Sequence, residues 1–210
     1  MRLLICIMLI TSVMACKNNQ SDPDSVKIAK EANKDKADTG SNIPMYKDTV
    51  AATMAVEKAD ADFSVEAANG NMIEVQLGGL AQTKAVKDRV KSFASMMIND
   101  HTKISEDLQK IATSKNITLP QELSSEAKKD INRLSKKEGL NFDRAYINMM
   151  VADHKKDVAK FEKAARDCKD PDLKNFIEQT LPVLRKHLDS AKAIDKLFVV
   201  GNTEPSPAYP

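Results

Sequence analysis

The sequence predicts an all-α protein, specifically a ferritin-like four-helix bundle with a short extra helix between its second and third long helices. Charged residues make up 30% of the chain and aromatic residues only 4%, with six glycines and no tryptophan. This composition favours helices. Apolar residues recur at helical spacing in four long stretches, and no segment alternates polar and apolar residues as a strand would. Four such stretches with one long connection are typical of this bundle.

Five helices are expected, and residues that begin or end a helix set their approximate limits. Pro120 cannot continue the second helix, and Ser124 or Ser125 caps the short helix that follows it. Gly139 closes that short helix, and Pro171 opens the last long one. The expected ranges are about 62–83, 85–114, 124–137, 140–168 and 171–198.

Two of the long helices contain residues that oppose a straight, continuous helix. Gly70 lies inside the first, where it favours a break into two pieces. Pro182 lies in the middle of the last, where it predicts a kink.

A phrase that contains a histidine occurs twice in the chain. It reads F-A-S-M-M-I-N-D-H-T-K from Phe93 and Y-I-N-M-M-V-A-D-H-K-K from Tyr146. An aromatic residue, two methionines, an aspartate and a histidine recur at identical offsets. On a helical wheel centred on Met97, Asp100 lies about 60° to one side and His101 about 40° to the other. The polar pair therefore flanks the apolar stripe, where a neighbouring helix would cover it.

The second copy repeats this arrangement, because Asp153 and His154 flank Met150 in the same way. The third and last histidine of the chain, His187, also lies on the inward side of a predicted helix. Helix midpoints meet at one level whether neighbouring helices run parallel or antiparallel. The inward polar residues near the four midpoints are Glu74, His101, His154 and His187.

A buried layer of imidazole and carboxylate groups predicts a metal site, because these ligands suit zinc, iron, manganese or copper. Burying unpaired carboxylates is costly, so Asp143, Asp153 and Asp157 on the third long helix need cations, hydrogen bonds or a metal. We therefore expect Asp153 and Asp157 to be further ligands or, like Asp100, to orient the imidazoles. One transition metal ion is the expected cofactor, with Glu74, His101, His154 and His187 as its predicted ligands.

The alternative is that the polar layer is structural. Two helices of one bundle need similar apolar stripes, and inward polar groups usually pair with each other. The Glu-x-x-His spacing of di-iron proteins is absent at all three histidines, which argues against a redox di-iron enzyme. No Ser-His-Asp arrangement or Gly-rich phosphate loop is present, and a net charge of +2 does not indicate nucleic-acid binding. A binding protein or a structural protein is therefore favoured over an enzyme.

The first fifteen residues predict a signal peptide, with Arg2 followed by the short apolar stretch L-L-I-C-I-M-L-I. The next motif, S-V-M-A-C, ends at Cys16 and resembles a bacterial lipobox, although Met14 is a looser match. By that resemblance Cys16 carries acyl chains that anchor the protein to a membrane. The alternative is ordinary cleavage after Ala15, which leaves a free cysteine.

Both ends of the mature chain are expected to lie outside the folded domain. Residues 16–56 are polar and predict a lipid-anchored flexible linker, and the proline-rich residues 199–210 predict a disordered tail. The four-helix bundle is expected at 57–198. Cys168 is the one cysteine left after signal removal and lipidation, so it predicts a buried apolar residue and no disulfide framework.

Several segments together resemble an uncharacterised bacterial envelope family. They include A-D-F-S-V-E-A-A-N-G-N-M-I-E-V-Q-L-G, M-I-N-D-H-T-K, V-A-D-H-K-K-D-V-A-K-F-E-K and T-L-P-V-L-R-K-H-L, and the resemblance covers about 60–198. Members are usually labelled predicted outer-membrane proteins and placed among the ferritin-like folds. The resemblance implies a helical fold and a location in the envelope, with the outer membrane as the expected anchor, but no activity. The positions that match the family's motifs are Glu74, Asp100, His101, Asp153, His154 and His187.

Overall fold

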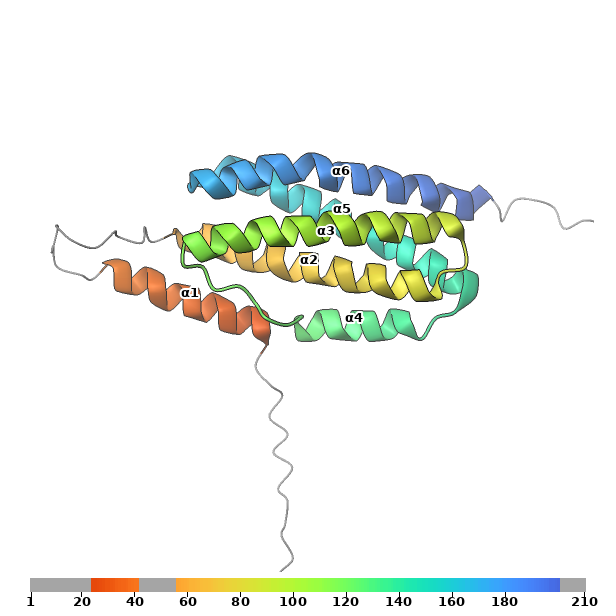
Figure 1. The fold of residues 1–210 in the computed structure, drawn as a ribbon, viewed down its shortest axis with the longest axis horizontal. Helices are drawn as coiled ribbons and strands as arrows, with labels where there is room; N and C mark the ends of the chain where they lie inside the picture. The colour runs from red at the N-terminus through yellow and green to blue at the C-terminus, as the bar shows by residue number, and fades with distance from the viewer. Residues whose placement is uncertain (1–23, 42–55, 201–210) are drawn as a thin grey trace, which may run out of the picture.

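The computed structural model describes residues 24–41 and 56–200, and these form six helices and no strand. The four long helices lie side by side, and the shorter α1 and α4 run along one side of the molecule next to α2 (Figure 1). The protein is therefore all-α, as the sequence predicts. The helices are α1 (Ser25–Ser41), α2 (Lys58–Lys84), α3 (Asp88–Ser114), α4 (Ser125–Ser135), α5 (Gly139–Asp167) and α6 (Pro171–Val200).

The five expected helices are present, and local signals account for several of their ends. Ser124 caps α4, because its hydroxyl oxygen accepts a hydrogen bond from the Ala127 backbone N–H at 3.2 Å. Gly139 has a φ of +57°, which a glycine adopts without strain, and it begins α5 after the short connection that follows α4. Pro171 is the first residue of α6, and Pro182 lies inside that helix without ending it.

The predicted break at Gly70 is wrong, because α2 is continuous from Lys58 to Lys84. Tertiary packing overrides a weak local propensity here. Gly78, by contrast, has a packing role. A Cβ atom at this position would lie 2.7 Å from Ile98 Cγ1 and 3.2 Å from the Ala94 carbonyl oxygen. The absence of a side chain at Gly78 therefore allows the close approach of α2 to α3.

The predicted linker at 16–56 is wrong for its central part, since Ser25–Ser41 form α1 and contact α2. The Asn33 side chain donates a hydrogen bond to the Thr118 carbonyl oxygen at 2.9 Å and accepts one from the Thr118 N–H at 2.7 Å. Ala29 is buried beside it, and Lys30 forms an ion pair with Glu66 at 2.7 Å. Such polar contacts leave no long apolar stripe in the sequence, which is why this helix was not predicted.

Several sequence-based expectations fall on residues outside those described. They are the signal peptide, the lipidated Cys16, the remaining parts of the expected linker and the tail from residue 201 onward. Within the described residues, no helix is both long enough and apolar enough to cross a membrane.

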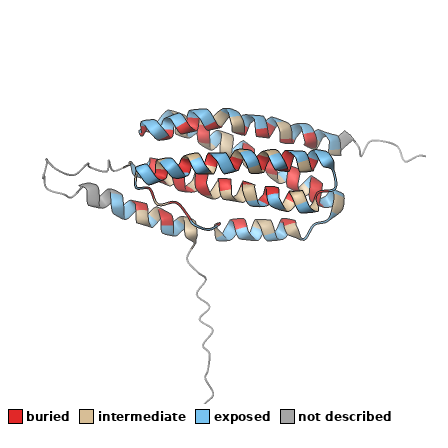
Figure 2. Cartoon of the chain, in the orientation of Figure 1, coloured by how far each residue is buried: buried red, intermediate tan, exposed pale blue. Residues whose placement is uncertain are grey.

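Buried residues recur along each of the long helices (Figure 2). They form two hydrophobic clusters, and each long helix contributes to both of them. On α3, for example, Met97 belongs to one cluster and Ile104 to the other, and the buried His101 lies between them. On α6, Leu184 and Ala191 lie in the same way on either side of the buried His187. A polar layer therefore separates the two apolar clusters at mid-helix.

Candidate metal centre

Three histidines from three helices meet in this polar layer. His101 comes from α3, His154 from α5 and His187 from α6, and their relative exposures are 2%, 0% and 0%. The ring centroids are 5.2 to 5.6 Å apart. One ligand atom from each ring lies within 4.8 Å of those from the other two. The prediction that the three histidines converge is therefore confirmed.

Each imidazole has one nitrogen bound to an oxygen outside the cluster. His154 Nδ1 lies 3.0 Å from the Met150 carbonyl oxygen, which can only accept, so this nitrogen carries the proton. His187 Nε2 donates in the same way to a carboxylate oxygen of Asp100 at 2.9 Å. His101 Nδ1 lies 2.9 Å from the side-chain oxygen of Asn71 on α2. These bonds select the tautomer in which the other nitrogen of each ring has a free lone pair.

Those other nitrogens have no hydrogen-bond partner. They are His101 Nε2, His154 Nε2 and His187 Nδ1, and all three are buried. Nitrogens with lone pairs cannot hydrogen-bond to one another, and a buried acceptor without a partner costs roughly 1–3 kcal/mol. A cation among them would satisfy all three. A ligand imidazole whose second nitrogen donates to a carboxylate or carbonyl is also the usual arrangement around bound metals.

The electrostatics of the layer keep the imidazoles neutral, which is the metal-binding form. Burial lowers the pKa of His101 well below its ordinary value, and the neighbouring His187 and His154 lower it further. Burial also lowers the pKa of His154 to about 4. For His187, burial lowers the pKa and the hydrogen bond to Asp100 partly offsets this effect.

Glu74 of α2 lies next to the cluster but is not one of its three members. Its Oε1 is 3.7 Å from His154 Nδ1, too far for a hydrogen bond, and its Oε2 has no partner. The residue is 1% exposed. Burial raises the pKa of this carboxyl well above its ordinary value, and Asp157 and Asp153 raise it further. Burial therefore favours the neutral form of this carboxyl over the charged form.

The two further ligands predicted from the sequence lie outside the histidine cluster. Asp153 forms an ion pair with Lys156 at 3.3 Å, and Asp157 forms one with Lys160 at 3.9 Å. Burial raises the pKa of Asp157 to about 6. Asp143 is explained differently, because its carboxylate accepts hydrogen bonds from the Val86 and Lys87 backbone N–H groups just before α3.

Two contacts of the site were missed by the sequence analysis. Nothing in the sequence marks the Met150 carbonyl oxygen, because every residue supplies a backbone carbonyl. Asn71 does give a signal, since it lies three residues before Glu74 and therefore on the same face of its helix. Asp100, which the sequence predicts to orient an imidazole, forms a hydrogen bond with His187 and not with the adjacent His101.

Comparisons with known proteins show a family and a fold. No curated protein matches the chain. Among solved structures, the chain is similar to a fragment of a DUF305 protein from Deinococcus radiodurans, with a TM-score of 0.60 and 12% sequence identity. The match covers 67% of this chain and 97% of that one. The family model of a domain of unknown function, DUF4142, matches residues 46–194, so the chain belongs to the DUF4142 family.

Proposed function

We propose that this protein is an envelope lipoprotein whose ferritin-like helical bundle binds one transition metal ion through His101, His154 and His187. The observation that carries the metal site is the set of three buried ring nitrogens without partners. The four long helices, each contributing a polar residue at mid-length, support the bundle arrangement.

Three neutral imidazoles suit zinc, copper, iron or nickel, and they leave a coordination position open. Zinc–nitrogen bonds of about 2.0–2.1 Å in a tetrahedral site place ligand nitrogens about 3.4 Å apart. The ligand atoms lie within 4.8 Å of one another, so binding requires the rings to turn inward slightly. The fourth position would be filled by a water molecule.

The burial of the site supports sequestration of the ion more than catalysis on a substrate. All three histidines and Glu74 are at most 2% exposed, so a bound ion would be shielded from molecules larger than water. The chemistry of the donor atoms fits retention of a metal, because every imidazole is already oriented by an outer hydrogen bond.

Anchoring through a lipidated Cys16 rests on the lipobox-like motif and the short apolar stretch before it. If this cysteine carries the acyl chains, Cys16→Ser should move the protein from the membrane fraction to the soluble fraction of the envelope. A Cys16→Ser protein that still sediments with membranes as the unaltered protein does would contradict the anchor.

The second candidate is a structural protein whose polar layer binds no metal. The hydrogen bonds of the histidines to Asn71, Met150 and Asp100 favour it, because they satisfy half of the ring nitrogens without an ion. The two candidates differ in what they predict for the other half. A structural layer leaves those nitrogens to water or without a partner, and its stability does not depend on added metal.

The test is a thermal unfolding titration of untagged protein with zinc, copper, iron and nickel, together with metal analysis after purification. An ion present at 100 times its dissociation constant stabilises the folded state by about 2.7 kcal/mol. For a domain of this size, we expect a rise in melting temperature of roughly 5–10 °C.

The rise should be absent in His187→Ala and present in Tyr146→Phe. Tyr146 is a suitable control because it is fully buried and its hydroxyl also lacks a partner, but it offers no ring nitrogen. If none of the four metals raises the melting temperature of the unaltered protein, the metal-binding proposal fails and the structural candidate stands.

A further inference from the structure

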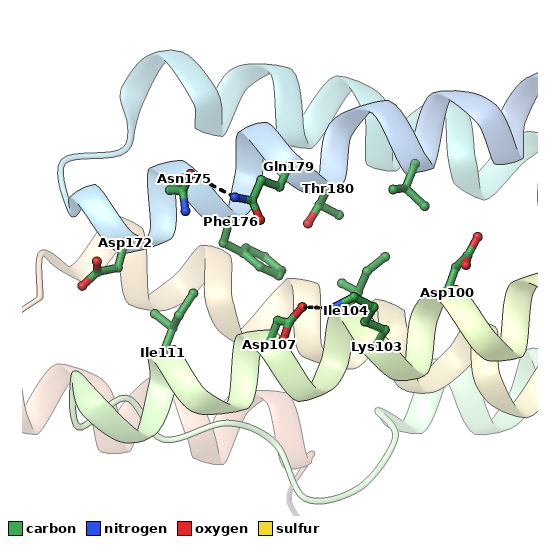
Figure 3. Close-up of a pocket in the computed structure, with 11 residues that line it drawn as sticks. Asp100, Lys103, Ile104, Asp107, Ile111, Asp172, Asn175, Phe176, Gln179 and Thr180 are labelled. Carbon is green, nitrogen blue, oxygen red and sulfur yellow. Dashed lines mark hydrogen bonds and ion pairs between the residues drawn. The ribbon is translucent and has the colours of Figure 1, made fainter.

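A surface groove of about 350 Å³ runs between α3 and α6 (Figure 3). Ile111 and Asp172 line one end, and Asp100 and Val183 line the other. His187 follows Val183 by one helical turn on α6, so this second end of the groove lies next to the histidine cluster.

Asp100 joins the groove to the cluster. Its Oδ2 accepts a hydrogen bond from His187 Nε2 at 2.9 Å, and its side chain is 35% exposed while that of His187 is 0% exposed. One carboxylate therefore contacts both the solvent in the groove and a predicted ligand of the buried site.

The other two carboxylates that line the groove are neutralised by lysines. Asp107 forms ion pairs with Lys103 at 2.9 Å and with Lys110 at 3.0 Å. Asp172 forms an ion pair with Lys115 at 2.6 Å. Asp100 is bonded to a neutral imidazole instead, so its negative charge is the one in the groove that remains available to a cation.

We propose that the groove between α3 and α6 is the route by which the metal ion reaches the histidine cluster, and that Asp100 binds the ion first. This inference rests on the proposed metal-binding function. An ion on Asp100 would displace the His187 Nε2–H group from the carboxylate, with the proton staying on Nε2, and the imidazole would then be free to turn. Rotation of this one side chain would admit the ion to the three free nitrogens.

A second route past α5 is less well supported. Asp153 and Asp157 lie on that side, but each forms an ion pair with a lysine, at 3.3 and 3.9 Å respectively. Asp153 and Asp100 occupy equivalent positions in the two copies of the repeated phrase, each directly before a histidine. Asp153→Asn is therefore a matched control for Asp100→Asn.

The experiment measures Zn²⁺ uptake by the full-length protein in a stopped-flow instrument and release to a coloured chelator, after equilibrium binding has been measured. Asp100→Asn keeps an oxygen that accepts from His187 but removes the charge. A carboxylate on the path lowers the barrier in both directions, so we expect association and dissociation both to slow roughly tenfold. The dissociation constant should then change little, and Asp153→Asn should behave as the unaltered protein.

A second pair of variants tests the groove itself. Val183→Phe places a larger side chain at the end of the groove next to the histidine cluster. Val75→Phe places an equally large side chain in a different surface hollow, which α2 helps to line. Val183→Phe should slow uptake and Val75→Phe should not, while both bind Zn²⁺ with nearly unchanged affinity.

The possible outcomes separate the two proposals. If Asp100→Asn only weakens equilibrium binding through faster release, Asp100 orients His187 and is not on the route. If Asp153→Asn slows uptake and Asp100→Asn does not, the route lies on the α5 side. If the unaltered protein binds no Zn²⁺ or other metal, the proposed function fails and the route with it.

Discussion

The two copies of the repeated phrase share two methionines, an aspartate and a histidine at the same offsets, yet their polar pairs make different contacts. In the α3 copy, Asp100 bonds to a histidine of another helix and His101 bonds to Asn71. In the α5 copy, Asp153 pairs with Lys156 of its own helix, and His154 bonds to the backbone of its own helix. Local sequence therefore places both histidines on the inward side of their helices, but the contact that each aspartate makes depends on the neighbouring helices.

The difference follows from what lies beside each helix. Asp100 faces the groove between α3 and α6 (Figure 3). His187 Nε2 lies 2.9 Å from its carboxylate oxygen. Asp153 meets no histidine, and a lysine one turn away on its own helix supplies its partner. The repeated histidines are equivalent members of one cluster, whereas the repeated aspartates are not equivalent.

The largest expected effect tests the equivalence of the histidines. His101→Ala and His154→Ala should each weaken zinc binding by roughly 1,000-fold, about 4 kcal/mol, because a site with three protein ligands loses one of them. Competition with a chelator of known affinity measures this loss. Two losses that differ by more than a factor of 100 would show that one imidazole is not a ligand.

The apolar part of the repeat should be equivalent as well. Met97 and Met150 are both fully buried in the same hydrophobic cluster. Met97→Ala and Met150→Ala should therefore each lower the free energy of unfolding by about 3 kcal/mol, through lost burial and a residual cavity. Urea unfolding measures the change, and both variants should still gain stability from zinc. A loss well under 1 kcal/mol in one of them would show that its copy is loosely packed.

The sequence predicts the meeting of the three histidines, but neither the partner of Asp100 nor the α1 helix. Helical periodicity and helix midpoints predict that His101, His154 and His187 meet, because both are properties of single helices. The partner of Asp100 could not be predicted, since it depends on which helix lies beside α3 and at what rotation. The α1 helix was missed because its contacts, such as those of Asn33, are polar and leave no periodic apolar pattern.

A third prediction uses pH to test the burial of His154 in the metal-free protein. The pKa of His154 is about 4 in the folded state, against an ordinary value of 6.5. Above pH 6.5 both states hold a neutral imidazole, and no stability is lost. As pH falls from 6.5 toward 4, the unfolded chain takes up the proton first, so the folded state loses stability.

Between pH 7 and pH 5 this single group should lower the free energy of unfolding by about 2 kcal/mol. Asp157 acts in the opposite direction, because its raised pKa of about 6 favours the folded state as pH falls. The contribution of His154 is therefore measured as the difference between unaltered protein and His154→Gln, by urea unfolding with a chelator present. Parallel pH profiles for the two proteins would show that this imidazole is not held neutral by burial.

The smallest expected effect bears directly on the aspartates. Asp100→Asn keeps an acceptor for His187 but loses the charge, and hydrogen bonds to charged groups are stronger than neutral ones. We expect it to lower the free energy of unfolding of the metal-free protein by about 1 kcal/mol.

Asp153→Asn should change the free energy of unfolding by less than about 0.5 kcal/mol. Its ion pair is with Lys156, whose side chain is 74% exposed, and such surface pairs contribute little. Burial also raises the pKa of Asp153, so removal of its charge relieves a desolvation cost that offsets the lost pair. Urea unfolding of both variants in the presence of a chelator measures the two changes. Equal losses of free energy of unfolding would show that the two aspartates contribute equally to stability, although their contacts differ.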